Sequence, residues 1–286
     1  MPRRGEDAQA SAPIVRPHQR TCRFGWKTAA MLVVAVLAIA AVVVPIVSQA
    51  SLRTGLMRAD PDAIVGNAAL RTFATATGQP AYDRHCVSCH GAHMEGDRAR
   101  GAPNLTDQDW LYGEGRVAEI ERTILHGIRS GDPKAWNLAD MPAFSQPVPY
   151  RRYKMAPLGP DEIRDVVEFL VVSAGKPGDR AAAARGTIVF DHKGQCFDCH
   201  AADAKGDSAI GAPNLLDDIW LSGNGSREDI YNIVAFGSGG YCPAWATQLD
   251  AVTIRALAVL VYLASHRPTP DAAPPSTGVR PDQQSK

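Results

Sequence analysis

The chain has 286 residues, enough for about two ordinary domains with additional segments. Its 30 Lys and Arg residues balance 30 Asp and Glu residues, so the net charge is zero and no basic surface is expected for binding nucleic acid. The six cysteines form two close pairs and two single residues, which is not the pattern of a disulfide framework.

An uncharged run covers residues 29–47 and, at about 1.5 Å per residue, spans roughly 28 Å, close to the ~30 Å hydrocarbon core of a bilayer. Arg and Lys dominate the residues before it, which indicates that this side stays in the cytoplasm. We expect a cytoplasmic segment over 1–28, a transmembrane anchor over 29–50 and a connector over 51–66. The rest of the chain then lies in the periplasm, anchored by a single pass in a bacterial inner membrane. Ser48-Gln49-Ala50 also fits a signal-peptide cleavage site, so a cleaved leader is the alternative.

The chain repeats itself after the anchor. Cys86-Val87-Ser88-Cys89-His90 returns as Cys196-Phe197-Asp198-Cys199-His200, an offset of 110 positions (196 − 86). At the same offset, Gly101-Ala102-Pro103-Asn104-Leu105 is repeated from Gly211. So long a match in one register predicts two duplicated domains.

The expected domains are all-α. Apolar residues at helical spacing predict one helix over 161–172, closing the first domain, and another over 252–264, closing the second. Their expected boundaries are 67–174 for domain one, 175–181 for a linker and 182–266 for domain two. The Pro-rich, polar tail over 267–286 is expected to be disordered.

Each Cys-x-x-Cys-His motif has the spacing of a c-type haem attachment site. The two thiols can add to the two vinyl groups of one haem, and the next residue places its imidazole at the iron. A zinc ribbon would hold its cysteine pairs roughly 15–20 residues apart, and a redox dithiol would need no adjacent His. The sequence therefore predicts two covalently bound haem c groups. The attachment residues are Cys86, Cys89 and His90, and Cys196, Cys199 and His200.

Met141 is the expected second axial ligand of the first haem. Pro142 follows it and fixes an extended loop that can present a thioether to a flat ring. Met94 and Met155 are the other methionines of this domain, and packing in the core is the usual role of a methionine.

The matching loop of the second domain reads Tyr241-Cys242-Pro243-Ala244-Trp245, and no methionine lies in that domain. Cys242 is therefore expected to bind the second haem iron as a thiolate. A free buried thiol beside a five-coordinate iron, or ligation by His266, are the alternatives. Because a thiolate stabilises ferric iron more than a thioether does, the sequence predicts that the second haem has the lower potential and passes electrons to the first.

The two domains resemble the dihaem subunit, subunit III, of cbb3-type cytochrome c oxidases. The resemblance covers Leu56 to His266 and rests on the Gly-Ala-Pro-Asn-Leu stretches, the Asp-x-x-Trp-Leu turn after each, and the stretch from His126 to Pro133 ahead of Met141. The chain departs from the family pattern at Cys242, where the family has Met, and in its anchor, which is aliphatic where the family's is rich in aromatic residues.

The resemblance implies a tandem cytochrome c subunit that relays electrons from a donor cytochrome toward a haem-copper oxidase core. It also implies that the carbonyls of Pro103 and Pro213 accept hydrogen bonds from the two motif histidines, and that Trp110 and Trp220 lie near haem propionates. A His/Cys-ligated haem is similar to those of thiosulfate dehydrogenases. A dihaem oxidoreductase of sulfur compounds is thus the alternative function.

Overall fold

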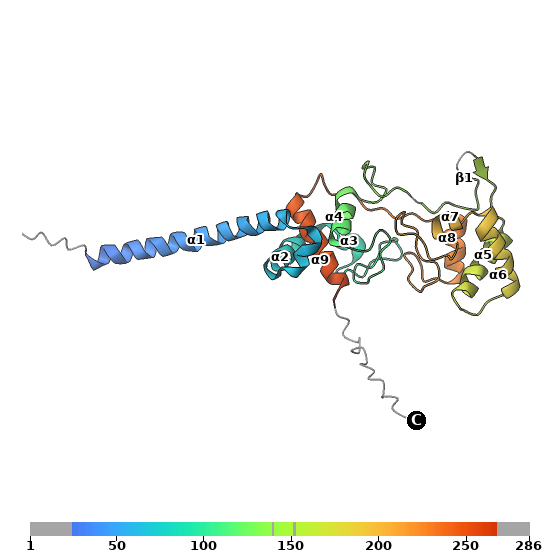
Figure 1. Ribbon diagram of the computed structural model, residues 1–286, viewed down its shortest axis with the longest axis horizontal. Helices are drawn as coiled ribbons and strands as arrows, with labels where there is room; N and C mark the ends of the chain where they lie inside the picture. The colour runs from blue at the N-terminus through green and yellow to red at the C-terminus, as the bar shows by residue number, and fades with distance from the viewer. Residues whose placement is uncertain (1–24, 139, 151–152, 268–286) are drawn as a thin grey trace, which may run out of the picture. The chain divides into compact units, whose positions relative to one another are not determined.

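The computed structural model describes residues 25–138, 140–150 and 153–267 (Figure 1). The chain divides into two compact units at Ser51. Helix α1 (Trp26–Arg58) begins in the first unit. From Thr28 it is long and apolar enough to cross a membrane, and its large apolar side chains up to Val47 are exposed. The basic segment before residue 25, which we expect in the cytoplasm, lies outside the described residues. The tail after residue 267, which we expect to be disordered, also lies outside them. The expected connector starts as helix, because α1 continues to Arg58.

The fold is all-α, as the sequence predicts. The helices after α1 are η1 (Pro61–Gly66), α2 (Ala68–His85), α3 (Val87–His90), α4 (Val117–His126), α5 (Pro160–Ser173), α6 (Arg180–Ile188), η2 (Val189–Lys193), α7 (Phe197–His200), α8 (Arg227–Phe236) and α9 (Ala251–Ser265). A short antiparallel hairpin, β1 (Val148–Tyr150) and β2 (Tyr153–Met155), precedes α5. Polar side chains at the N-caps of α2, α6, α8 and α9 accept hydrogen bonds from backbone N–H groups of the first turn, which otherwise have no partner within the helix.

The helices of the second unit form two bundles (Figure 1). Bundle A consists of η1, α2, α3, α4 and α9, and in it α9 packs on α2 and α4. Bundle B consists of α5, α6, η2, α7 and α8, and in it α5 packs on α6 and α8. The elements of bundle B are therefore continuous in sequence, whereas bundle A is assembled from segments on both sides of bundle B.

This packing corrects the expectation that the helix over 161–172 closes the first domain and the helix over 252–264 the second. The loop between α5 and α6 is short, and a short connection makes two helices antiparallel neighbours. α5 consequently packs in the bundle that contains the motif at 196–200, and α9 packs in the bundle that contains the motif at 86–90. Helical periodicity identified the apolar face of each helix but not which of two similar partners would cover it.

A glycine lets the two helices of each central pair approach closely. In bundle A, Gly78 of α2 faces α9, and an added Cβ would lie 2.8 Å from the carbonyl oxygen of Ala256. In bundle B, Gly186 of α6 meets the backbone of Asp165 in α5, and an added Cβ would collide with its carbonyl group. The two bundles thus use the same kind of helix crossing although their helices come from different parts of the sequence.

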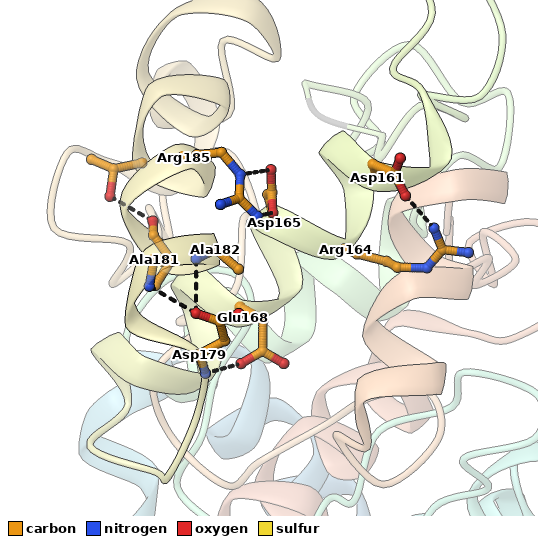
Figure 2. Close-up of polar contacts among 10 residues, drawn as sticks. Asp161, Arg164, Asp165, Glu168, Asp179, Ala181, Ala182 and Arg185 are labelled. Carbon is orange, nitrogen blue, oxygen red and sulfur yellow. Dashed lines mark hydrogen bonds and ion pairs between the residues drawn. The ribbon is translucent and has the colours of Figure 1, made fainter.

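Polar contacts fix the orientation of α5 against α6 (Figure 2). The guanidinium of Arg185 donates to both carboxylate oxygens of Asp165, at 2.8 and 2.6 Å. Asp179 caps α6, and its own backbone N–H donates to the carboxylate of Glu168 in α5 at 2.8 Å. Contacts as exposed as these contribute about 0–1 kcal/mol each, so the apolar core provides most of the stability.

A buried ion pair joins α9, α4 and the end of α1. Arg255 donates through Nε to Glu121 at 3.0 and 3.1 Å, and the two side chains are only 13% and 11% exposed. Its Nη1 lies 3.3, 3.4 and 3.2 Å from the carbonyl oxygens of Leu56, Met57 and Ala59. A positive charge at the C-terminal end of α1 also matches the helix dipole.

We expect Arg255→Met to lower the free energy of unfolding of the second unit by about 3–5 kcal/mol, because it leaves the Glu121 carboxylate buried without its partner. Denaturant titration of the protein in detergent measures this change. Arg164→Met is the matched control: its partner Asp161 is 96% exposed, so the expected loss is below about 1 kcal/mol. Equal losses in the two variants would contradict a structural role for the buried pair.

Candidate haem sites

The two Cys-x-x-Cys-His motifs form equivalent helical turns. The backbone N–H of His90 donates to the carbonyl of Cys86 at 2.9 Å, and that of His200 donates to the carbonyl of Cys196 at 3.0 Å. None of the five cysteines within the described ranges forms a disulfide. Each turn can therefore offer two thiols and one imidazole to the same macrocycle.

A proline carbonyl orients the histidine of each motif. His90 Nδ1 lies 3.1 Å from the carbonyl oxygen of Pro103, and His200 Nδ1 lies 3.0 Å from that of Pro213. Burial lowers the pKa of both histidines, more than the carbonyl contact raises it. A neutral imidazole that donates through Nδ1 keeps the Nε2 lone pair for a metal ion.

The loop that carries Met141 lies along the end of α8 in bundle B. Met141 and Ser238 exchange two backbone hydrogen bonds, at 3.1 and 3.0 Å, and the N–H of Phe144 donates to the carbonyl of Val234 at 3.0 Å. Gly237 has a φ of +79° and leaves room for this approach, because an added Cβ would lie 2.6 Å from the carbonyl oxygen of Met141.

The loop that carries Cys242 lies along the end of α4 in bundle A in the same way. Cys242 and Ile128 exchange two backbone hydrogen bonds, at 3.0 and 2.9 Å, and the N–H of Trp245 donates to the carbonyl of Ile124 at 3.0 Å. Gly127, the equivalent glycine, has a φ of +74°, and an added Cβ there would collide with the carbonyl of Cys242. The thiol of Cys242 is close enough to Cys89 for a charge on one to affect the pKa of the other.

The structure therefore reverses the expected pairing of the sulfur-bearing loops with the two motifs. Met141 lines one cavity with the motif at 196–200, and Cys242 lies beside the motif at 86–90. The expectation that Met141 faces the first motif and Cys242 the second was wrong. The order of the two potentials stays a prediction. Each loop follows the motif of its own repeat in sequence. It nevertheless packs in the bundle that holds the other motif, together with the helix that comes after it, α5 or α9.

Burial dominates the acidity of the thiols in bundle A. Burial raises the pKa of Cys242 to about 11, with a smaller contribution from Cys89. Burial also raises the pKa of Cys86 to about 12, with Cys242 as the next cause. A nearby positive metal centre reverses this effect, because a coordinating thiol is deprotonated.

The cavity of bundle B has a volume of about 320 Å³ and mostly apolar walls. Cys196, Cys199, His200 and Met141 all line it, and so does Trp220. The indole N–H of Trp220 is buried and has no hydrogen-bond partner among the residues that the structure describes. Two thiols, an oriented imidazole, a thioether and a buried donor without an acceptor together fit a covalently bound haem with a carboxylate near Trp220.

The two tryptophans occupy equivalent positions in the repeats. Trp110 lies against Gly115, which has a φ of +74°, and Trp220 lies against Gly225, which has a φ of +73°. An added Cβ at either glycine would collide with the indole ring, so both rings are held in place by the backbone of the same turn.

Sequence reasoning assigned no role to two residues that reach the cavity of bundle B from the first repeat, Leu111 and Arg129. Arg129 Nε donates to the carbonyl of Gly240 at 2.5 Å and lies 4.0 Å from the carboxylate of Asp140. The second repeat has Gly239 in place of this arginine, which was the one signal available. Leu111 and Arg129 reach this cavity because segments of the first repeat pack in bundle B, and this long-range packing could not be read from the sequence.

Two family models match this chain. Residues 75–173 match the model described as cytochrome c, and residues 181–261 match the model described as cytochrome c oxidase, cbb3-type, subunit III. These matches establish cytochrome c domains, and such domains carry covalently bound haem c.

Curated relatives agree with these matches. The chain is 39% identical over 197 residues to the cbb3-type cytochrome c oxidase subunit FixP of Azorhizobium caulinodans, covering 68% of this chain and 61% of that protein. It is 34% identical over 215 residues to the subunit CcoP of Cereibacter sphaeroides (75% and 69%) and 36% identical over 215 residues to CcoP of Rhodobacter capsulatus (72% and 68%). The chain thus spans less than two thirds of the length of the FixP relative. It belongs to the family of the CcoP and FixP subunits of cbb3-type cytochrome c oxidases.

Proposed function

We propose that this chain is a membrane-anchored dihaem cytochrome that relays electrons in a respiratory chain as a cbb3-type oxidase subunit. The observation that carries the proposal is that each bundle brings together one Cys-x-x-Cys-His motif and one sulfur-bearing loop. Bound haem c supplies reversible one-electron chemistry at its iron. The names of the relatives favour relay over the oxidation of sulfur compounds.

The residues of each bundle would hold one haem. In bundle A, Cys86 and Cys89 would form the thioether bonds, and His90 and Cys242 would bind the iron. In bundle B, Cys196 and Cys199 would form the thioether bonds, and His200 and Met141 would bind the iron. Pro103 and Pro213 would keep the imidazoles oriented, and Trp110 and Trp220 would donate to propionates.

The apolar part of α1 supports a single-pass anchor in a bacterial inner membrane, with the basic N-terminal segment in the cytoplasm and both bundles in the periplasm. The proposed partners are a haem-copper oxidase core and a donor cytochrome. The oxidase named for the relatives supports the first of these partners.

The first test of this function is a count of haems. The purified chain should carry two haems that survive acid-acetone extraction, because thioether bonds are covalent. The double variant Cys196→Ser, Cys199→Ser should keep one, and mass spectrometry of haem peptides should place it on residues 86–90. A haem count that the double variant leaves unchanged would contradict the second attachment site.

Membrane topology provides a second test. A reporter enzyme that works only in the periplasm should be active when fused after Lys286, and the protein should stay in the membrane after a high-salt wash. A cytoplasmic reporter fused at the same position should be inactive. Release of a soluble species that begins at Ser51 would show that residues 1–50 are a cleaved leader and would contradict the anchor.

A further inference from the structure

Tyr112 is a buried tyrosine whose hydroxyl has no hydrogen-bond partner among the residues that the structure describes. The residue is only 7% exposed. A buried hydroxyl without a partner costs about 1–3 kcal/mol, and such groups in native proteins usually meet a ligand or an ordered water molecule.

The ring of Tyr112 is held firmly by bundle A. It stacks on Trp136 with ring centres 4.8 Å apart and an angle of 21° between the planes. The indole N–H of Trp136 donates to the hydroxyl of Thr123 at 3.0 Å, and the guanidinium of Arg122 lies 3.5 Å from the centre of the Trp136 ring. The tyrosine hydroxyl therefore has a defined position and little freedom to turn toward solvent.

That position lies against bundle B. The ring and hydroxyl of Tyr112 occupy the space where a side chain of Gly211 would stand; an added Cβ would lie 2.7 Å from the hydroxyl oxygen. Gly211 lines the cavity of bundle B, and so does Leu111, the residue before Tyr112. The next residue, Gly113, donates its N–H to the carbonyl of Ser208 in bundle B at 3.0 Å. The turn that carries Tyr112 is thus part of the wall between the two bundles.

The equivalent turn of the second repeat also contacts a glycine of the other bundle, but with a smaller side chain. Ser222 is the counterpart of Tyr112 at the offset of 110, and it lines the cavity of bundle B. Its hydroxyl oxygen would lie 3.4 Å from a Cβ added to Gly101 of bundle A. Of these two hydroxyl groups, that of Tyr112 is the one that is buried without a hydrogen-bond partner among the described residues.

The cavity of bundle B therefore has two buried donors without acceptors close to its wall, the indole N–H of Trp220 and the hydroxyl of Tyr112. A haem bound at Cys196 and Cys199 carries two propionates, the only strong acceptors on the macrocycle. We propose that the Tyr112 hydroxyl donates a hydrogen bond to a propionate of the haem in bundle B. Bundle A would then help to set the potential of the neighbouring haem, and this inference rests on the two haems of the proposed function.

Replacement of the hydroxyl alone tests this inference. In the full-length protein with the variants Cys86→Ser and Cys89→Ser, which leave only the haem of bundle B, Tyr112→Phe should lower the midpoint potential. The reason is that a propionate without its donor presents more negative charge to the iron. The propionate bending bands of the resonance Raman spectrum should shift in the same variant. Tyr231→Phe, a half-buried tyrosine of bundle B, is the matched control and should change neither quantity.

An unchanged potential and unchanged propionate bands in Tyr112→Phe, with the haem attached, would overturn the inference and leave the proposed function intact. A shift confined to the haem of bundle A, measured in the background Cys196→Ser and Cys199→Ser, would also overturn it. Absence of any haem at Cys196 and Cys199 in the unmodified chain would overturn the proposed function, and the inference with it.

Discussion

A chain that ends at Gly240 should lose the structure of bundle A and keep that of bundle B. The truncation removes the loop of Cys242 and the whole of α9, whose Ile254, Leu257 and Val259 are 1%, 1% and 0% exposed. Burial of each such side chain contributes about 1.5–3 kcal/mol, so their loss is comparable with the whole stability of an ordinary domain, about 5–15 kcal/mol. Limited proteolysis of the truncated protein should therefore degrade residues 51–136 and leave a resistant fragment that contains α5 to α8.

The spectra of the truncated chain provide a second readout. The haem of bundle B should retain the absorption of a His/Met site, because Met141 and His200 are both present and their bundle is intact. Deletion of residues 268–286 alone is the control and should change neither proteolysis nor spectra. A truncated chain in which bundle A resists proteolysis and α5 to α8 are degraded would contradict the packing of α5 in bundle B and of α9 in bundle A.

Redox titration of the full-length protein should give two well-separated waves, with the lower one belonging to bundle A. The thiolate of Cys242 carries a negative charge that favours ferric iron, whereas the thioether of Met141 is neutral and favours ferrous iron. Axial ligands shift haem potentials by up to ~0.8 V, so this difference should exceed the effect of any single surface charge. Cys242→Met should raise the lower wave strongly and leave the upper wave in place.

Met141→Ala is the reciprocal variant, and it should disturb only the upper wave. Electrons would then move downhill from bundle A to bundle B, which is the order of the motifs in the sequence. Two waves that overlap in the unmodified protein, together with no shift in Cys242→Met, would mean that Cys242 is an ordinary buried thiol.

Local features of the site could be predicted from the sequence. The motif at 86–90 and its copy at 196–200 are each complete within five residues, because one macrocycle fixes the spacing of its thiols and imidazole. The contacts of the motif histidines with Pro103 and Pro213, which the resemblance to the cbb3-type subunit implies, also lie within a short stretch of chain. The all-α fold followed from helical periodicity.

The features that required knowledge of long-range packing could not be predicted. The loops of Met141 and Cys242 have similar sequences and meet similar helix ends at Gly237 and Gly127, so either loop suits either bundle locally. The short connection between α5 and α6 decides the pairing, and its effect appears only when the helices pack. Tyr112 was missed for the same reason, since its contact with Gly211 joins two bundles.

Electron paramagnetic resonance of the two single-haem proteins tests the reciprocal ligand assignment most directly. With Cys196→Ser and Cys199→Ser, which leave the haem on His90, the ferric protein should show the low-spin signal of thiolate ligation, and Cys242→Ala should abolish it while Met141→Ala leaves it unchanged. With Cys86→Ser and Cys89→Ser, which leave the haem on His200, the thiolate signal should be absent and the spectrum should depend on Met141 alone. A thiolate signal found only in the protein with the haem on His200, and lost there in Cys242→Ala, would contradict the assignment.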